Sequence, residues 1–258
     1  MPFSPEAAAR FIFDAHDKRE PYRNLPPEIA PASLDEAYAA QEALAELLAP
    51  RFGDVAGLKI AVATKVMQEL MGIDRPLGGI ILAKRVHASP ATIRLTDHIN
   101  VVVEFELAVR LNRDLPQSAT PWTAETVQPA IAAVMPAFEL IEDRNADYKR
   151  TDALSLIVDN CWNAGIVLGA EVPFVPQMRL AGVAGHLSIN GRDAHHGSTD
   201  DPLGTLAWVA NLAVERKRPL KAGMVVITGS VIPTLPIAMG DCFVFQLDGL
   251  GSVEANGR

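Results

Sequence analysis

Alternation of apolar and polar residues is clearest over residues 100–111. The odd-numbered positions from Val103 to Leu111 are all apolar, whereas the even-numbered positions include Glu104, Glu106 and Arg110. Successive side chains of a strand point to opposite faces of a sheet, so this period of two predicts a half-buried strand. Shorter apolar runs predict further strands at 58–62, 78–82, 136–141, 224–228 and 242–247, and another that ends at residue 168.

Helical signals dominate the first third of the chain. Ser4 precedes a proline and a helix that runs to Phe13, and residues 33–36 form a capping box for a second helix that ends at Pro50. Further helices are predicted at 66–71, 123–133 and 205–214. We therefore expect an α+β protein, in which a helical N-terminal region (residues 1–56) packs on a β-rich core (residues 57–258) that forms one functional unit.

Two segments lack a simple period. Residues 222–240 carry no charge, but prolines and hydroxyl side chains interrupt them, so they predict a strand, a turn and a second strand rather than a membrane span. Residues 190–201 are rich in Gly and Asp and contain His195 and His196. A surface loop is the favoured interpretation of this segment, and a second metal site or a lid is the alternative.

Composition narrows the class of protein. The 258 residues are 49% hydrophobic and 21% charged, which is an ordinary globular balance and excludes a disordered chain. A formal net charge of −8 argues against nucleic acid or an anionic membrane as a partner. The two cysteines are far apart and the N-terminus lacks the pattern of a secretory signal, so we expect a cytoplasmic protein without a disulfide framework.

Three carboxylates occupy positions where acids are unusual. Glu104 and Glu106 leave the same face of the predicted strand with Cβ atoms ~7 Å apart, so their oxygens can converge on one cation. The pair alone is more typical of the solvent-exposed face of a half-buried strand. Glu139 lies within an apolar run, where a buried acid must be protonated, paired with a cation or bound to a metal. Three carboxylates without a nearby Cys or His pair would suit Mg²⁺ or Mn²⁺ rather than zinc. A salt bridge to Arg or Lys is the alternative.

Lys59 stands among apolar residues in the predicted strand 58–62. An edge-strand lysine that points to water is the common explanation of such a position. The functional alternatives are an ammonium group that binds a carboxylate substrate, or an amine whose pKa is lowered by burial until it can move protons.

The same residues resemble those of a known family. Residues 57–60, 64–68 and 72–74 are similar to the N-terminal signature of the 2-keto-4-pentenoate hydratases, and residues 103–108 and 137–144 resemble the two strands that supply acids in that family. The match continues in order and spacing at 159–160, 220–223, 228–230, 240–241 and 249–253. Together these motifs are typical of the wider fumarylacetoacetate hydrolase superfamily.

The resemblance implies a fold, a cofactor and a set of site residues. The implied fold is a mixed, strongly curved β-sheet roll of the fumarylacetoacetate hydrolase C-terminal-domain type, assembled into a homo-oligomer. The implied metal ion is Mg²⁺ or Mn²⁺, and the implied substrate is a small 2-oxo or 2-hydroxy-dienoic acid. The implied site residues are the metal ligands Glu104, Glu106 and Glu139, the catalytic and substrate-binding Lys59, and the substrate-binding Gln68 and Asn160.

The reaction that the resemblance implies is addition of water to a 2-hydroxy-2,4-dienoate, which gives a 4-hydroxy-2-oxo acid in the catabolism of aromatic compounds. The chain departs from the hydratase pattern at Leu77, where an acid is usual, and at Cys161-Trp162, where Ala-Ser is usual. A 4-oxalocrotonate-type decarboxylase therefore stays open as an alternative, as does a non-catalytic relative that binds a metal or an organic acid. An acylpyruvate hydrolase ranks behind the first two reactions, because residues 65–74 contain no histidine.

Overall fold

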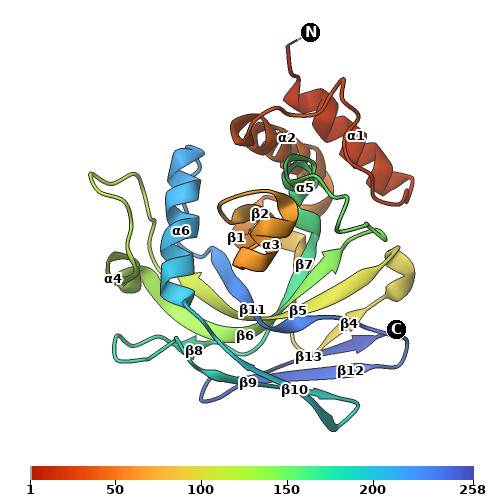
Figure 1. Ribbon diagram of the computed structural model, residues 1–258. Coiled ribbons are helices and arrows are strands. Elements are labelled where there is room, and N and C mark those ends of the chain that lie inside the picture. The colour runs from red at the N-terminus through yellow and green to blue at the C-terminus, as the bar shows by residue number, and fades with distance from the viewer. Residues whose placement is uncertain (1) are drawn as a thin grey trace.

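Two β-sheets make up the centre of the molecule, and the N-terminal helices gather at one end of it (Figure 1). The computed structural model describes residues 2–258. The α-helices are α1 (Pro5–Asp17), α2 (Leu34–Phe52), α3 (Lys65–Met71), α4 (Ala124–Val127), α5 (Ala153–Val158) and α6 (Pro202–Glu215). The 3₁₀ turns are η1 (Ala83–Arg85), η2 (Leu95–Asp97), η3 (Gln128–Ala130) and η4 (Asn160–Trp162).

The larger sheet is mixed and curls on itself. It has the strand order β2-β1-β11-β5-β6-β7-β3, with β8 paired to β6. Its strands are β1 (Val55–Ala61), β2 (Leu77–Leu82), β3 (Val86–Ala88), β5 (Val101–Leu111), β6 (Ile131–Glu142), β7 (Asn163–Leu168), β8 (Val172–Pro173) and β11 (Val225–Pro236). Because β2, at one end of this order, contacts β7, near the other end, the sheet forms a half-barrel with an inner and an outer face.

The smaller sheet covers the outer face of the larger one. Its order is β10-β9-β12-β13-β4, with β4 (Ala91–Ile93), β9 (Ala184–Ile189), β10 (Arg192–Ser198), β12 (Cys242–Leu247) and β13 (Gly251–Gly257). The apolar face predicted for residues 100–111 lies between the two sheets, where the Phe105 ring packs 5.7 Å from Phe138 and 5.6 Å from Phe245. The inner face of the half-barrel is therefore left to the even-numbered residues of β5.

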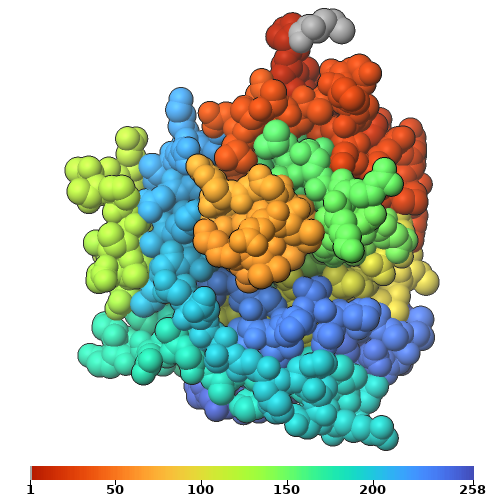
Figure 2. Space-filling view, viewed as in Figure 1, coloured from red at the N-terminus to blue at the C-terminus, as the bar shows by residue number. Residues whose placement is uncertain are grey.

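The N-terminal helices form a second apolar cluster with α5 and β2. Ser4 and Ser33 cap α1 and α2 as their sequence patterns predict. Buried Gln41 on α2 donates hydrogen bonds to Gly78 O and Ile157 O, each at 2.9 Å, and so ties α2 to β2 and to α5. In Figure 2 the segment around α3 occupies the middle of the visible face, with α6 on one side and α5 on the other.

Several boundaries differ from the prediction. The helix expected at 123–133 is wrong beyond residue 130, since residues 131–142 form β6, whose first residues pair with the end of β5. Helix α2 continues through Pro50 to Phe52, because a proline in the last turn removes a single helical hydrogen bond. Residues 225–236 form one long strand, and bulges rather than a turn bend it.

The segment 190–201, expected as a surface loop, is also corrected. Residues 192–198 form β10, which pairs with β9. Asn190 and Gly191 connect the two strands, both with positive φ (54° and 74°), as in a tight hairpin turn. Within residues 2–258, no helix is both long enough and apolar enough to span a bilayer.

Candidate metal centre

The three carboxylates that the sequence singles out lie together on the inner face of the half-barrel. Glu104 on β5 is directly opposite Glu139 on β6, and Glu106 follows two residues along β5. One carboxylate oxygen from each residue lies within 4.8 Å of the others. Like charges placed opposite each other on neighbouring strands destabilise a sheet, so an arrangement of this kind calls for a compensating positive charge.

Burial makes the demand for a cation stronger. Glu106 and Glu139 are both 0% exposed. Glu106 Oε2 accepts a hydrogen bond from Gly229 N at 2.5 Å, but its Oε1 is buried and accepts none from residues 2–258. Glu139 Oε2 is also buried and accepts no hydrogen bond from residues 2–258. Two buried acceptor oxygens without donors are available to coordinate an oxygen-binding cation.

The protonation states reflect the same crowding. Burial raises the pKa of Glu139 to about 7, and the nearby Glu104 carboxylate adds to the rise, while Lys59 opposes it. Burial also raises the pKa of Glu106 well above its usual range, helped by Glu139 and Glu104. Without further positive charge, the cluster therefore holds on to protons that a bound cation would displace.

Lys59 is the neighbouring cation. Strand β1 lies between β2 and β11, so the edge-strand explanation of Lys59 is wrong. The side chain is buried, and its Nζ lies 2.9 Å from Glu139 Oε1. Burial lowers the pKa of Lys59, but Glu139 outweighs burial and the net shift is upward, so Lys59 is a charged ammonium group rather than a base. The space for it depends on Gly79, where an added Cβ would stand 2.9 Å from Lys59 Cγ.

One ammonium group does not neutralise three carboxylates. Among residues 2–258, Lys59 is the cation within ion-pair distance of the triad, and it contacts Glu139 alone. The salt-bridge alternative therefore accounts for one acid and leaves Glu104 and Glu106 uncompensated. An all-oxygen donor set with two free buried oxygens fits a hard divalent ion such as Mg²⁺ or Mn²⁺.

Neighbouring strands orient the three acids. Asn163 at the start of β7 donates from Nδ2 to Glu139 Oε1 at 2.7 Å, and Thr234 on β11 donates from Oγ1 to Glu104 Oε1 at 2.8 Å. Sequence reasoning missed both residues and the Gly229 amide. They are remote from the acids in the chain, and strand pairing alone brings them near.

The amides of Gln68 and Asn160 are both engaged in backbone contacts. Gln68 Nε2 donates to Val62 O and Ala63 O, at 3.2 and 3.3 Å, which holds α3 against the end of β1. Asn160 Oδ1 accepts a hydrogen bond from Ile80 N at 2.6 Å, and Asn160 Nδ2 donates one to Ile80 O at 2.8 Å. The side-chain amide thus pairs with the backbone of β2 as a neighbouring strand would. The place of Gln68 and Asn160 in substrate binding stays a prediction, whereas the hydrogen bonds of Asn160 fix η4 against β2, the strand that pairs with the Lys59 strand β1.

A buried ionic network supports the turn that carries Asn160. The three residues of η4 all have positive φ, between 47° and 58°, a conformation that non-glycine residues adopt reluctantly. Asp159 precedes them and is held by the Arg144 guanidinium and by His16 Nε2, the latter at 2.6 Å. The contact with His16 makes the N-terminal helix α1 part of the support for the site.

The departures from the hydratase pattern lie in the packing of β2 and η4 against the N-terminal helices. Leu77 is 0% exposed and belongs to the apolar cluster of the N-terminal helices. Trp162 belongs to the same cluster and packs edge-on against Tyr22 and Tyr148, each with a centroid distance of 5.1 Å. Both residues therefore belong to the apolar packing between the N-terminal helices, β2 and η4, where Trp162 Nε1 is buried without a partner among residues 2–258.

Comparison with known sequences places the chain in a family. Residues 71–256 match the model of the fumarylacetoacetate (FAA) hydrolase C-terminal family. A 2-keto-4-pentenoate hydratase of Burkholderia vietnamiensis is 30% identical over 223 residues, which cover 85% of this chain and 84% of that protein. A second relative, 2-keto-4-pentenoate hydratase 2 of Dechloromonas aromatica, is 28% identical over 258 residues, or 98% of this chain and 97% of that protein.

Solved structures show the same architecture. The 4-oxalocrotonate decarboxylase from Pseudomonas putida G7, complexed with magnesium and adipate, superposes with a TM-score of 0.89 at 23% identity, covering 98% of this chain and 97% of the other. The curved sheet roll that the sequence implies is thus confirmed. The chain belongs to the fumarylacetoacetate hydrolase C-terminal family, and within that family it is an enzyme of the hydro-lyase type.

Proposed function

We propose that the protein is a metal-dependent hydratase that adds water to a 2-hydroxy-2,4-dienoate of the 2-keto-4-pentenoate type. The observation that carries the proposal is the convergence of Glu104, Glu106 and Glu139 with two buried, unpartnered oxygens. In this proposal the three carboxylates bind one divalent ion, Mg²⁺ or Mn²⁺. The names of the sequence relatives support a dienoate as the substrate.

The acidic and basic residues of the site would have different roles. A divalent ion held by the triad would supply Lewis-acid stabilisation of an enolate that develops on a 2-oxo acid. Lys59, charged and buried beside Glu139, is suited to bind the substrate carboxylate or to deliver a proton as the dienol becomes a ketone. Asn163 keeps the Glu139 carboxylate turned toward Lys59. Leu77 and Trp162 pack in the apolar cluster behind η4, the turn that carries Asn160.

Absorbance spectroscopy tests this function directly. Mixing the protein and Mg²⁺ with 2-hydroxypenta-2,4-dienoate should remove the dienol absorbance and yield the 4-hydroxy-2-oxo acid. A chelator should stop the reaction and added Mg²⁺ should restore it. Turnover that persists in metal-stripped protein would contradict the metal-dependent mechanism.

A parallel assay separates the two related reactions. Consumption of 4-oxalocrotonate with release of CO₂, without hydration of the dienoate, would assign the protein as a decarboxylase and overturn the hydratase proposal. Light scattering on the purified protein would test the expected homo-oligomer in the same samples.

A further inference from the structure

A pair of imidazole side chains lies on the smaller sheet, away from the acidic triad. His186 on β9 and His196 on β10 are direct cross-strand partners. Their Nδ1 atoms are 3.0 Å apart, and their rings meet edge to face at 5.2 Å between centroids. Figure 1 places β9 and β10 on the side of the molecule opposite α1 and α2.

Carboxylates occupy the other nitrogen of each ring. His196 Nε2 lies 2.9 Å from Asp193 Oδ2, and His186 Nε2 lies 3.3 Å from Asp248 Oδ1. An ionised carboxylate accepts hydrogen bonds and donates none, so Asp193 favours the hydrogen on Nε2 of His196 and leaves the lone pair on its Nδ1. His196 Nδ1 can then accept a hydrogen bond from His186 Nδ1 at 3.0 Å, and a metal ion that binds both nitrogens would displace this one proton.

The spacing of the two nitrogens suits a transition-metal ion. With metal–nitrogen bonds of about 2.0–2.1 Å, two ligands lie about 2.9 Å apart at a right angle and about 3.3 Å apart at the tetrahedral angle. The observed 3.0 Å lies between these values. A carboxylate on the far nitrogen of a metal-binding histidine is a common supporting contact, because it fixes the ring orientation and raises the basicity of the ligand.

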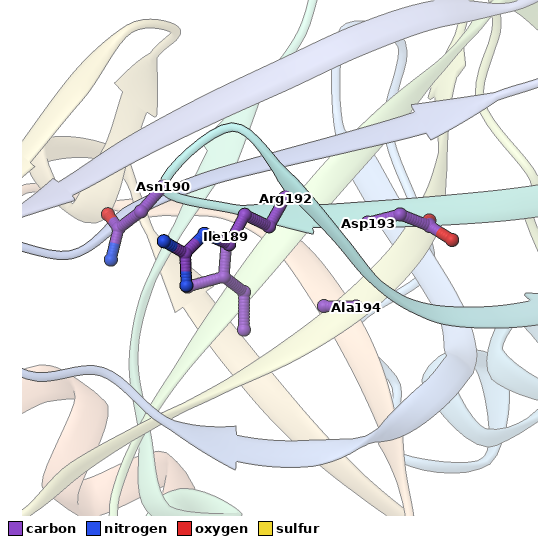
Figure 3. Close-up of a pocket in the computed structure, with 5 residues that line it drawn as sticks. All are labelled: Ile189, Asn190, Arg192, Asp193 and Ala194. Carbon is purple, nitrogen blue, oxygen red and sulfur yellow. The ribbon is translucent and has the colours of Figure 1, made fainter.

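A β-bulge brings Asp193 beside His196. Asp193 pairs with Ser188 and His195 pairs with Leu187, so Ala194 is the additional residue of β10. Residues three apart in a regular strand face opposite sides, but the bulge brings Asp193 to the same side as His196. Figure 3 shows the strand end, with the Asp193 side chain directed away from Arg192 and the hairpin turn.

We propose that His186 and His196 form a binding site for one late first-row divalent ion, such as Zn²⁺ or Ni²⁺, with water completing the coordination. The imidazole donors prefer such ions, in contrast to the all-oxygen triad. Because β10 is the edge strand of the smaller sheet, an ion bound across the pair would tie that edge to β9. The site does not depend on the proposed hydratase activity.

Calorimetric titration with Ni²⁺ in the presence of excess Mg²⁺ tests the site. The full chain should bind one Ni²⁺, and His186→Gln and His196→Gln should each lose this binding. His195→Gln is the matched control, since His195 pairs with buried Leu187 on the other side of the same strands and should leave binding unchanged. Equal Ni²⁺ binding by His196→Gln and the unaltered chain would overturn the proposal, as would a loss of binding in His195→Gln.

Spectroscopy adds a readout that does not depend on enzyme activity. Electron paramagnetic resonance of bound Cu²⁺ should show hyperfine coupling to two imidazole nitrogens in the unaltered chain and in His195→Gln. A spectrum with oxygen ligands only would assign the ion to carboxylates and reject the histidine site. Circular dichroism of each variant would verify that these exposed substitutions leave the fold intact.

Discussion

The acidic triad and the histidine pair have the same cross-strand geometry but differ in burial and in the type of donor atom. Glu104 and Glu139 are direct partners on antiparallel strands, and so are His186 and His196. Glu139 is fully buried on the inner face of the half-barrel, whereas the histidines lie on an exposed hairpin. Cross-strand pairing therefore places two ligands together in either setting, and burial and donor type decide which ion they suit.

The difference in burial also decides how much each site matters to folding. A carboxylate without a counter-charge in the interior costs several kcal/mol unless it takes up a proton. The histidine pair is solvated, and one ring can donate a hydrogen bond to the other when no ion is bound. Changes at the triad should therefore alter activity and stability together, and changes at the histidines should alter ion binding alone.

The largest effect is expected for Glu106→Gln and Glu139→Gln. Loss of one ligand should lower kcat/KM for the dienoate by about a thousandfold or more, because Lewis-acid stabilisation contributes several kcal/mol to such a step. In chelator, Glu106→Gln should be at least as stable as the unaltered protein, since it removes a desolvated acid from beside two others. Steady-state absorbance assays and thermal melts measure the two quantities.

Asp193→Asn is the matched control for this pair of variants, because it changes a carboxylate at the other site. It should retain full hydratase activity. Equal loss of activity in Asp193→Asn and Glu106→Gln would remove the distinction between the two sites. Full activity in Glu106→Gln would exclude that carboxylate from the mechanism.

The next largest effect is expected for Lys59→Met. It leaves Glu139 buried without its ion-pair partner, and removal of one member of a buried pair costs about 3–5 kcal/mol. Urea denaturation in metal-free buffer should show this loss, together with lost activity. The exposed Lys84→Met on η1 is the control and should change the free energy of unfolding by less than about 0.5 kcal/mol. A Lys59→Met protein as stable as this control would show that the acid cluster does not need the ammonium group.

Mg²⁺ should stabilise the folded protein through the triad alone. At a hundred times its dissociation constant, an ion that binds the native state adds about 2.7 kcal/mol, which raises the melting temperature by roughly 5–10 °C in a chain of this size. The shift should disappear in Glu106→Gln and persist in His196→Gln. A shift that survives in Glu106→Gln would place the Mg²⁺ elsewhere.

Sequence reasoning reached the triad because its signals are local. The alternation over residues 100–111 identifies the strand, and a carboxylate in the apolar run around Glu139 is conspicuous on its own. The curvature of the sheet is not local, since it depends on which strands pair. Asn163 and Thr234, which orient the acids, could not be found for that reason, and their assignment required the strand order.

The pairing of His186 with His196 shows what the sequence could not predict. Asn190-Gly191 is a strong hairpin signal, and reading it would have replaced the predicted loop with two strands. Even then, the bulge at Ala194 decides which histidine faces His186. Without the bulge the alternation would be displaced by one residue, so His195 rather than His196 would take that position. No feature of the sequence alone fixes a bulge of this kind.

The smallest effect should distinguish the two carboxylates behind the histidines. Asp193→Asn should weaken Ni²⁺ binding by about tenfold, because supporting contacts to metal-bound histidines typically contribute 10–100-fold to affinity. Asp248→Asn should weaken it less, since Asp248 lies 3.3 Å from its imidazole and Asp193 lies 2.9 Å away. Calorimetry on both variants would measure this order. The reverse order would mean that Asp248 rather than Asp193 is the main support of the ligand geometry, and that the bulge, which brings Asp193 beside His196, is not what positions the rings.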